Sequence, residues 1–223
     1  MTTKRPRLKL KGILPALWPQ ARRHINAGNI GGFLSSTDSG NSMHLVTRNW
    51  WWLEQRGLHV KALLRAWSNQ KIAYRWEPAM RYFLLECDRE ELVRCCDPFP
   101  EGDSYTLYRG VQNFAHRQSN PHGISWTTSL EVAKRFAGED GNVYMATVRR
   151  KDVHARIHES GRGEHEMLLL LNGDEPLAVV GGNREEECRG SMLFCDNAGL
   201  THRPIPASGV AGESPQEGLK YEQ

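Results

Sequence analysis

The spacing of apolar residues changes at one turn-rich segment, residues 97–103, which reads Asp-Pro-Phe-Pro-Glu-Gly-Asp. Before this segment, apolar residues recur at three- and four-residue intervals, which is typical of amphipathic helices. After it, they fall in short runs rich in β-branched and aromatic residues, which is typical of strands. A helical region followed by a strand-rich region with one helix of its own predicts an α+β fold.

The region of residues 50–98 is expected to be helical. Two apolar stripes with helical spacing lie in it, and Pro78 stands near the expected start of the second; the stripes are Val60, Leu63, Leu64 and Trp67, then Met80, Phe83, Leu84 and Cys87. Three adjacent indoles, Trp50, Trp51 and Trp52, cannot all face one side of a helix. At least one is therefore expected near the surface, either to pack against another element or to stack on a base.

The region of residues 99–203 is expected to hold the sheet. Short strands are expected at residues 105–109, 123–127, 142–148 and 166–171, and a helix at about 130–137 with Val132, Ala133 and Phe136 on one face. Strands broken by a helix and long loops predict a split antiparallel sheet. Residues 204–223, rich in Pro, Gly, Ser and Glu, are expected to form a flexible tail.

Residues 1–49 are expected to form a basic arm and loop, because they are rich in Gly and Ser and lack any acidic residue up to Thr37. Such a segment either attracts phosphate polymers or is a solvated arm. No run of eighteen apolar residues and no export signal is found, so we expect a cytoplasmic protein away from membranes. The five cysteines are an odd number without a Cys-x-x-Cys pair, which favours reduced thiols; a zinc site with Cys95 and Cys96 is the alternative.

Three groups of residues in the strand-rich region suggest chemistry. Arg109 ends one expected strand and precedes Gly110, Ser125-Trp126-Thr127 opens a second, and Glu164-His165-Glu166 opens a third. In a strand, residues two apart face the same side, so both glutamates are expected to point into one cleft. Two carboxylates held side by side repel each other, which costs free energy unless a cation or a substrate hydroxyl interacts with them.

These residue types suit the cleavage of a nicotinamide–ribose bond. Loss of nicotinamide leaves an oxocarbenium-like ribose, which a carboxylate stabilises, while a second carboxylate can orient or deprotonate the nucleophile. The fork of Arg109 matches a diphosphate, and Gly110 lets the backbone approach a flat ring. Ser125 can brace the carboxylate, and Phe136 can stack on nicotinamide.

The ordered set resembles the arginine-serine-glutamate class of mono-ADP-ribosyltransferases, most closely its phage and bacterial members. The matching motifs are Tyr108-Arg109-Gly110, Ile124-Ser125-Trp126-Thr127-Thr128 with Val132-Ala133 and Phe136-Ala137, the run 143–148, and Gly161-Arg162-Gly163-Glu164-His165-Glu166. They lie within residues 105–171, under a third of the chain. Each motif alone is weakly specific, and their order carries the resemblance.

The resemblance implies a role for each matching residue. Glu166 is the catalytic glutamate, Ser125 supports it, and Glu164 helps to select or activate the acceptor. Arg109 binds the phosphates of NAD+, and Gly110, Phe136 and the strand residues Ser125, Trp126 and Thr127 contact the co-substrate. The loop of residues 158–163, with His158 and Arg162, meets the target. Trp126 stands where the family commonly has threonine, so the register Thr127-Thr128-Ser129 is an alternative.

The resemblance leaves three functions open. The first is an NAD+-dependent toxin that modifies RNA or DNA, since some relatives do so, including the toxin of a phage-defence toxin–antitoxin–chaperone system; the basic residues favour it, and an antitoxin would then be a partner. The second is a transferase acting on protein arginine, which the Glu-x-Glu pair favours. The third is a non-catalytic nucleic-acid-binding module. NAD+ is the only co-substrate implied, and the mechanism requires no metal.

Overall fold

A computed structural model describes residues 7–70, 75–112, 120–157, 163–171, 173 and 177–181. All of these residues fall in one compact unit, residues 1–187. Helices precede a six-stranded antiparallel sheet, with one further helix inserted between strands. The α+β class expected from the sequence is therefore confirmed. No helix in these ranges is both long enough and apolar enough to cross a bilayer.

The first half of the chain is helical from residue 15 onward. Its elements are η1 (Pro15–Leu17), α1 (Trp18–Asn26), α2 (Ile30–Leu34), η2 (Ser39–Asn41), α3 (Ser42–Arg48), α4 (Trp50–Glu54), α5 (His59–Ser68), α6 (Glu77–Glu86) and α7 (Arg89–Cys95). Between α4 and α7 this agrees with the helices expected from the apolar stripes. Trp51 is 62% exposed while Trp50 and Trp52 are buried, as three adjacent indoles on one short helix require.

The structure of residues 15–48 differs from the expected arm and loop. The small polar residues that suggested a loop serve the helices instead, since the Asn29 side chain caps α2 by accepting from the Gly32 amide at 2.8 Å. Gly32 also packs against the His24 ring, where a Cβ would come within 2.5 Å of Nδ1. Between these caps, apolar side chains such as Phe33 and Met43 are fully buried, so this segment forms part of the core.

The second half supplies the sheet. Its elements are β1 (Ser104–Val111), β2 (Ser125–Thr127), α8 (Leu130–Ala137), β3 (Asn142–Arg149), η4 (Arg150–Asp152), β4 (Val153–Ile157), β5 (Glu166–Leu169) and β6 (Ala178–Gly181). The strand order is β4-β5-β2-β1-β3-β6, and every pairing is antiparallel. The sequence did not predict β4 or β6, although β4 alternates buried and half-buried residues as a strand should.

The sheet has its shortest strand pairing at its centre, between β1 and β2. β1 pairs with β3 over eight residues, but with β2 only through Tyr108 opposite Thr127. Beyond this point β1 and β2 are not paired, so side chains from both can meet in the space between them. The single connection divides one continuous sheet into halves of three strands each, and the candidate site lies at that division.

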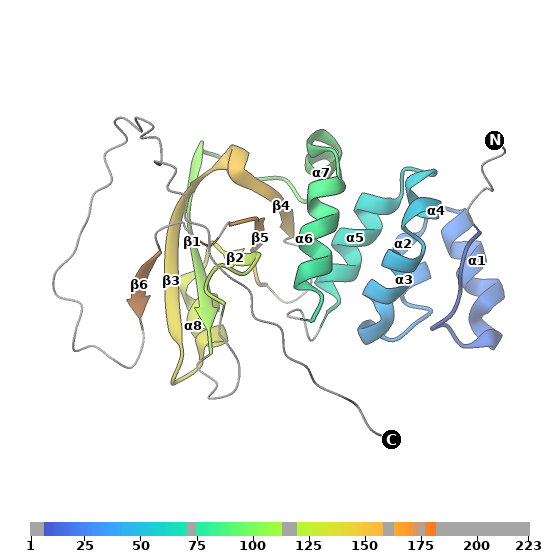
Figure 1. Ribbon diagram of the computed structural model, residues 1–223, viewed down its shortest axis with the longest axis horizontal. Coiled ribbons are helices and arrows are strands. Elements are labelled where there is room, and N and C mark those ends of the chain that lie inside the picture. The colour runs from blue at the N-terminus through green and yellow to red at the C-terminus, as the bar shows by residue number, and fades with distance from the viewer. Residues whose placement is uncertain are drawn as a thin grey trace, which may run out of the picture. The chain divides into compact units, whose positions relative to one another are not determined.

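Helix α8 covers one face of β1 and β3 (Figure 1). Ser129 caps its first turn by accepting from the Val132 amide. Ala133 and Ala137 face the sheet and are buried, whereas Phe136 is 46% exposed, so the expected apolar face is rotated. The approach is close because a Cβ on Gly110 would lie 1.9 Å from the Ala133 carbonyl oxygen, which only a glycine permits.

A shared core joins the helices to one face of the sheet. The largest cluster of buried side chains contains residues from α1 to α7 together with Ile124, Ala155, Ile157 and Leu168. Helix α7 lies beside β4 (Figure 1). The turn-rich segment at residues 97–103 therefore marks a change of secondary structure within one packed body.

Candidate active site

Strand pairing brings Ser125 and Glu166 together. In the register of β2 and β5, Thr127 lies opposite Glu166 and Ser125 lies opposite Leu168, so Ser125 and Glu166 are diagonal neighbours on one face. The Ser125 hydroxyl donates to Glu166 Oε1 at 2.5 Å. A short hydrogen bond to a carboxylate fixes its orientation and stabilises its charge.

A second donor to the same carboxylate oxygen comes from the helical half. The indole Nε1 of Trp67, on α5, donates to Glu166 Oε1 at 2.9 Å across 99 positions of sequence. Trp67 is 3% exposed, so the donor of this hydrogen bond is shielded from water, while the acceptor Glu166 is half-buried. The apolar stripe of α5 predicted Trp67 as a core residue only. Its single indication of a further role is the N–H, which requires an acceptor when an indole is buried.

Arg109 is joined to this pair through the backbone of β2. Its Nη1 donates to the Ser125 carbonyl at 2.7 Å, and its Nε donates to the Asn120 carbonyl at 3.2 Å. Gly123 makes room for the guanidinium, because a Cβ there would lie 2.0 Å from Nη2. Arg109 thus holds the start of β2 in place while its charge stays next to Glu166.

The electrostatic surroundings of Arg109 are mixed. Burial lowers the pKa of its guanidinium, and the Arg81 charge adds to this, while the carboxylates of Glu77 and Glu166 favour the charged form. Because the ordinary pKa of arginine is so high, Arg109 remains a cation. A partly desolvated cation beside a carboxylate creates a strong local field, which suits a substrate that carries charges of both signs.

A second arginine extends the network toward the end of β5. Arg81, on α6, donates to the carbonyls of His122 and Leu171 and pairs with Glu77 at 3.2 Å. Asn120 donates from its amide to the same Glu77 oxygen at 3.5 Å. None of these residues was singled out by the sequence, since they belong to segments that become neighbours only when the helices pack on the sheet.

Glu164 does not share a strand face with Glu166. β5 begins at Glu166, and His165 before it has φ of 48°, a left-handed conformation uncommon for a non-glycine residue. The expected alternation therefore does not extend to Glu164, whose carbonyl instead accepts from Thr127 Oγ1 at 2.7 Å. A strained residue next to a proposed catalytic side chain is a common feature of functional sites.

Two other residues of the β2 motif serve the fold. Trp126 is 2% exposed and its Nε1 donates to the Gly123 carbonyl at 2.8 Å, so its side chain belongs to the core. Thr127 is 5% exposed and also accepts from the Ser129 amide. These contacts join the Glu164 loop to the start of α8. That Trp126 and Thr127 contact the co-substrate stays a prediction.

Gly110 and Phe136, both expected to contact the co-substrate, lie at helix α8: Gly110 packs against it from β1, and Phe136 belongs to it. Gly110 is required by the close approach of α8 described above, and its contact with a ligand ring stays a prediction. Phe136 is 46% exposed, and its ring lies 5.6 Å from the Arg135 guanidinium carbon. An exposed aromatic ring remains accessible to a bound molecule.

Two expected acceptor-binding residues, His158 and Arg162, lie outside the described residues, and so do residues 182–223. Within the described ranges, no group of three or more His, Cys, Asp or Glu side chains is placed to hold a metal ion. Cys87, Cys95 and Cys96 are free thiols, and burial raises the pKa of each.

Comparison with known proteins gives no further assignment: no family model matches the chain, and no curated protein or solved structure matches significantly. The site therefore has to be interpreted from its own geometry. It comprises the Glu166 carboxylate, which accepts hydrogen bonds from Ser125 and Trp67, and the Arg109 guanidinium. Arg109 is linked to Glu166 by two successive hydrogen bonds through Ser125.

Proposed function

We propose that this protein is an NAD+-dependent mono-ADP-ribosyltransferase that transfers ADP-ribose to a macromolecule, with nucleic acid favoured as the acceptor. The observation that carries the proposal is the orientation of Glu166 by two donors to one oxygen, Ser125 Oγ and Trp67 Nε1. Such a carboxylate is preorganised to face developing positive charge without rearranging during the reaction.

In the proposed reaction, the bond between ribose C1′ and the nicotinamide nitrogen breaks. The electron pair leaves with the nicotinamide, which departs as a neutral molecule, and the ribose becomes oxocarbenium-like. Glu166 stabilises that cation. The acceptor then forms a new bond to C1′ and loses a proton to a general base, the role that the family resemblance gives to Glu164. Arg109 supplies positive charge for the diphosphate.

Arg109 is partly committed to the protein in this arrangement. Two of its N–H groups donate to backbone carbonyls, so three of the five, on Nη1 and Nη2, are left as donors for phosphate oxygens. A guanidinium carries five N–H donors, so it can hold β2 and a phosphate together. Arg109→Lys would keep the charge but lose this double role.

The test of the chemistry uses NAD+ labelled in its adenylate half. Purified protein is incubated with RNA, with DNA and with cell protein in separate reactions, and label retained in each macromolecule is measured. We expect transfer to nucleic acid, and a loss of at least about 100-fold in the Glu166→Gln variant, because the new side chain keeps its shape but lacks the charge. Glu139→Gln, at an exposed position, is the matched control and should transfer label as the wild type does.

Two results would each overturn a different part of the proposal. Label found only in protein would reject nucleic acid and favour the arginine-directed alternative. Equal label with wild type and Glu166→Gln, at equal protein levels, would reject the catalytic assignment itself and leave a non-catalytic binding protein. A growth assay adds an independent readout, since an active enzyme of this kind should slow the growth of the expressing cell while Glu166→Gln should not.

A further inference from the structure

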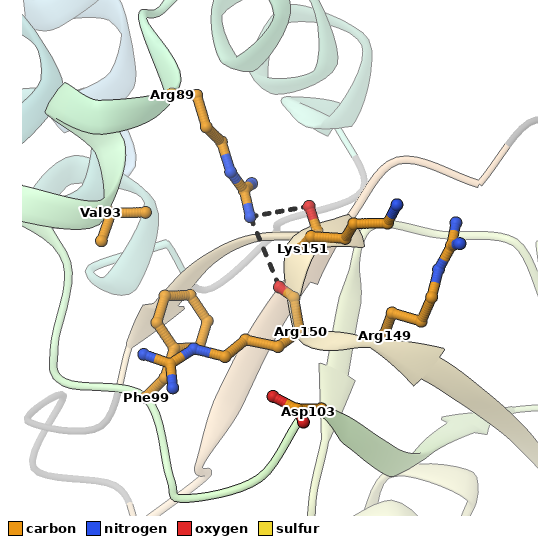
Figure 2. A pocket seen from close by; sticks show the side chains of 7 residues that line it. All are labelled: Arg89, Val93, Phe99, Asp103, Arg149, Arg150 and Lys151. Carbon is orange, nitrogen blue, oxygen red and sulfur yellow. Dashed lines mark hydrogen bonds between the residues drawn. The ribbon is translucent and has the colours of Figure 1, made fainter.

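A hollow of about 470 Å³ lies where the end of β3 and the η4 turn meet helix α7. Four of its seven lining residues are cationic and only one is acidic; the seven are Arg89, Val93, Phe99, Asp103, Arg149, Arg150 and Lys151 (Figure 2). The seven residues carry a formal net charge of +3, from four cations and one carboxylate, which equals the formal net charge of the whole 223-residue chain. A net positive charge gathered around one hollow favours an anionic ligand.

The backbone of the η4 turn is held rigidly beneath these cations. Arg89 Nη2 donates to the Lys151 carbonyl at 2.9 Å and to the Arg150 carbonyl at 3.5 Å. On the other side, the Arg150 amide donates to the Asp103 carbonyl at 2.8 Å. Figure 2 shows the resulting arrangement, in which the Arg150 side chain extends toward Phe99 while those of Arg149 and Lys151 extend in the opposite direction.

Much of the positive charge is left without a carboxylate partner. Arg149 pairs with Asp152 at 2.8 Å, but neither Arg150 nor Lys151 forms an ion pair within the described residues. The surrounding charge also acts on Asp152, where the hydrogen bond from Arg149 is the main reason that the pKa of this carboxyl lies below its ordinary value. Unpaired guanidinium and ammonium groups on a fixed backbone are suited to phosphate oxygens.

The hollow also has an aromatic side. The Arg150 guanidinium carbon lies 5.5 Å from the centre of the Phe99 ring, and Phe99 is nearly parallel to Tyr105, at an interplanar angle of 9°. Val93 adds an apolar surface that is 44% exposed. A flat ring and a guanidinium next to unpaired cations match the base and the phosphate of a nucleotide, whereas an acidic peptide would need only the cations.

We propose that this hollow binds a nucleotide unit of a single-stranded nucleic acid, with phosphates on Arg150 and Lys151 and a base against Phe99. The proposal rests on the proposed function only in naming this strand as the acceptor of ADP-ribose. The strand registers place the two sites apart: Arg149 pairs with Ser104 at one end of β1, while Glu166 is reached through Tyr108 and Thr127. Four residues along the strands and three strand spacings across the sheet give a separation of about 20 Å, which is about six stacked nucleotides.

Binding is tested by fluorescence anisotropy with a labelled single-stranded RNA of about 12 nucleotides, long enough to fill one such groove. All proteins carry Glu166→Gln and no NAD+ is added, so binding is measured apart from chemistry. The test variant is Arg150→Gln with Lys151→Gln. The matched control is Lys61→Gln with Arg65→Gln, two exposed cations on α5, which removes the same charge elsewhere.

We expect the test variant to bind about 25-fold more weakly at 0.1 M salt, from two lost phosphate contacts at about five-fold each, and to show a salt slope smaller by about 1.4. Phe99→Leu should weaken binding about five-fold or more without changing the slope, because a lost stacking contact releases no counterions. The control variant should stay within about two-fold of the parent protein.

Equal weakening in the control variant would show that only overall charge matters and would overturn the proposal. So would displacement of the RNA by polyglutamate at equal charge concentration, because that would assign the hollow to acidic protein. The two proposals can also fail separately. RNA binding that depends on Arg150 and Lys151 without any label transfer would reject the transferase alone, and transfer to RNA that is unaffected by both substitutions would reject the hollow alone.

Discussion

Replacing Trp67 with phenylalanine tests whether the helical half contributes to catalysis. The change removes the Nε1 donor to Glu166 Oε1, a 2.9 Å hydrogen bond from a side chain that is only 3% exposed. The aromatic ring at the same position on α5 is kept, so most of the apolar burial is retained. The expected result is a large fall in the rate of ADP-ribose transfer with a small loss of stability.

The expected fall in kcat/KM follows from the hydrogen bond that is lost and the one that remains. Hydrogen bonds to charged groups contribute about 1.5–3 kcal/mol, and Ser125 Oγ still holds the same oxygen after the substitution. If the full contribution is expressed in the transition state, kcat/KM falls about 10- to 150-fold. Because the lost bond favours the ionised carboxylate, the acid limb of the pH–rate profile should also move to higher pH.

The assay measures kcat/KM for NAD+ as a function of pH, together with the melting temperature. Trp52→Phe is the matched control, since Trp52 is a buried indole of α4 with 6% exposure, and its ring stacks under Arg56 rather than contacting the site. The control should lose stability to a similar extent while keeping its pH profile. If Trp67→Phe behaved like this control, with kcat/KM within about two-fold of the wild type, the proposed role of Trp67 in holding Glu166 would be refuted.

Three further substitutions or treatments give separate expectations. Gly123→Ala places a methyl group 2.0 Å from Arg109 Nη2, so the guanidinium must move, and we expect a loss of about 1–3 kcal/mol in the free energy of unfolding and weaker NAD+ binding by calorimetry; unchanged values would contradict the packing described. Burial, reinforced by the Arg89 charge, lowers the pKa of His154. The unfolded chain therefore takes up a proton more readily than the folded protein, and stability is lost as the pH falls below about 6.5. His154→Gln should reduce the fall in melting temperature between about pH 7.5 and 5.5, and an identical fall in the variant and the wild type would contradict this role of His154. Burial raises the pKa of Cys87 to about 12, so at pH 8 only about 1 thiol in 10⁴ is ionised, and iodoacetamide should modify Cys87 only after unfolding, as peptide mass spectrometry would measure.

The sequence predicted the elements whose signals are local. The stripe of Val60, Leu63, Leu64 and Trp67 forms the buried face of α5, and α8 has the bounds that its spacing predicted. The two helices depend on periodicity and short-range capping, which a single sequence records directly. The contact between Ser125 and Glu166 was expected instead from the chemistry of the motifs and their resemblance to a known family, and the two side chains do meet.

Features that depend on distant packing were missed. Nothing local indicates that the Trp67 indole reaches a carboxylate 99 positions away. The helices of residues 15–48 were missed because Asn29 and Asp38 act as caps at the starts of short helices, where polar residues resemble those of a loop. The alternation expected from Glu164 to Glu166 is interrupted at one residue, His165, whose φ of 48° is left-handed, and β5 begins only at Glu166.

The two donors that hold Glu166 come from opposite halves of the chain, and this has a consequence for how the protein matures. During synthesis α5 emerges from the ribosome well before β2 and β5, so Trp67 is present in the nascent chain before its acceptor Glu166 has been made. The Trp67 hydrogen bond to the Glu166 carboxylate can form only when β5 has packed against α5. A truncated chain that lacks α5 would therefore carry the Glu166 carboxylate without the Trp67 hydrogen bond that orients it.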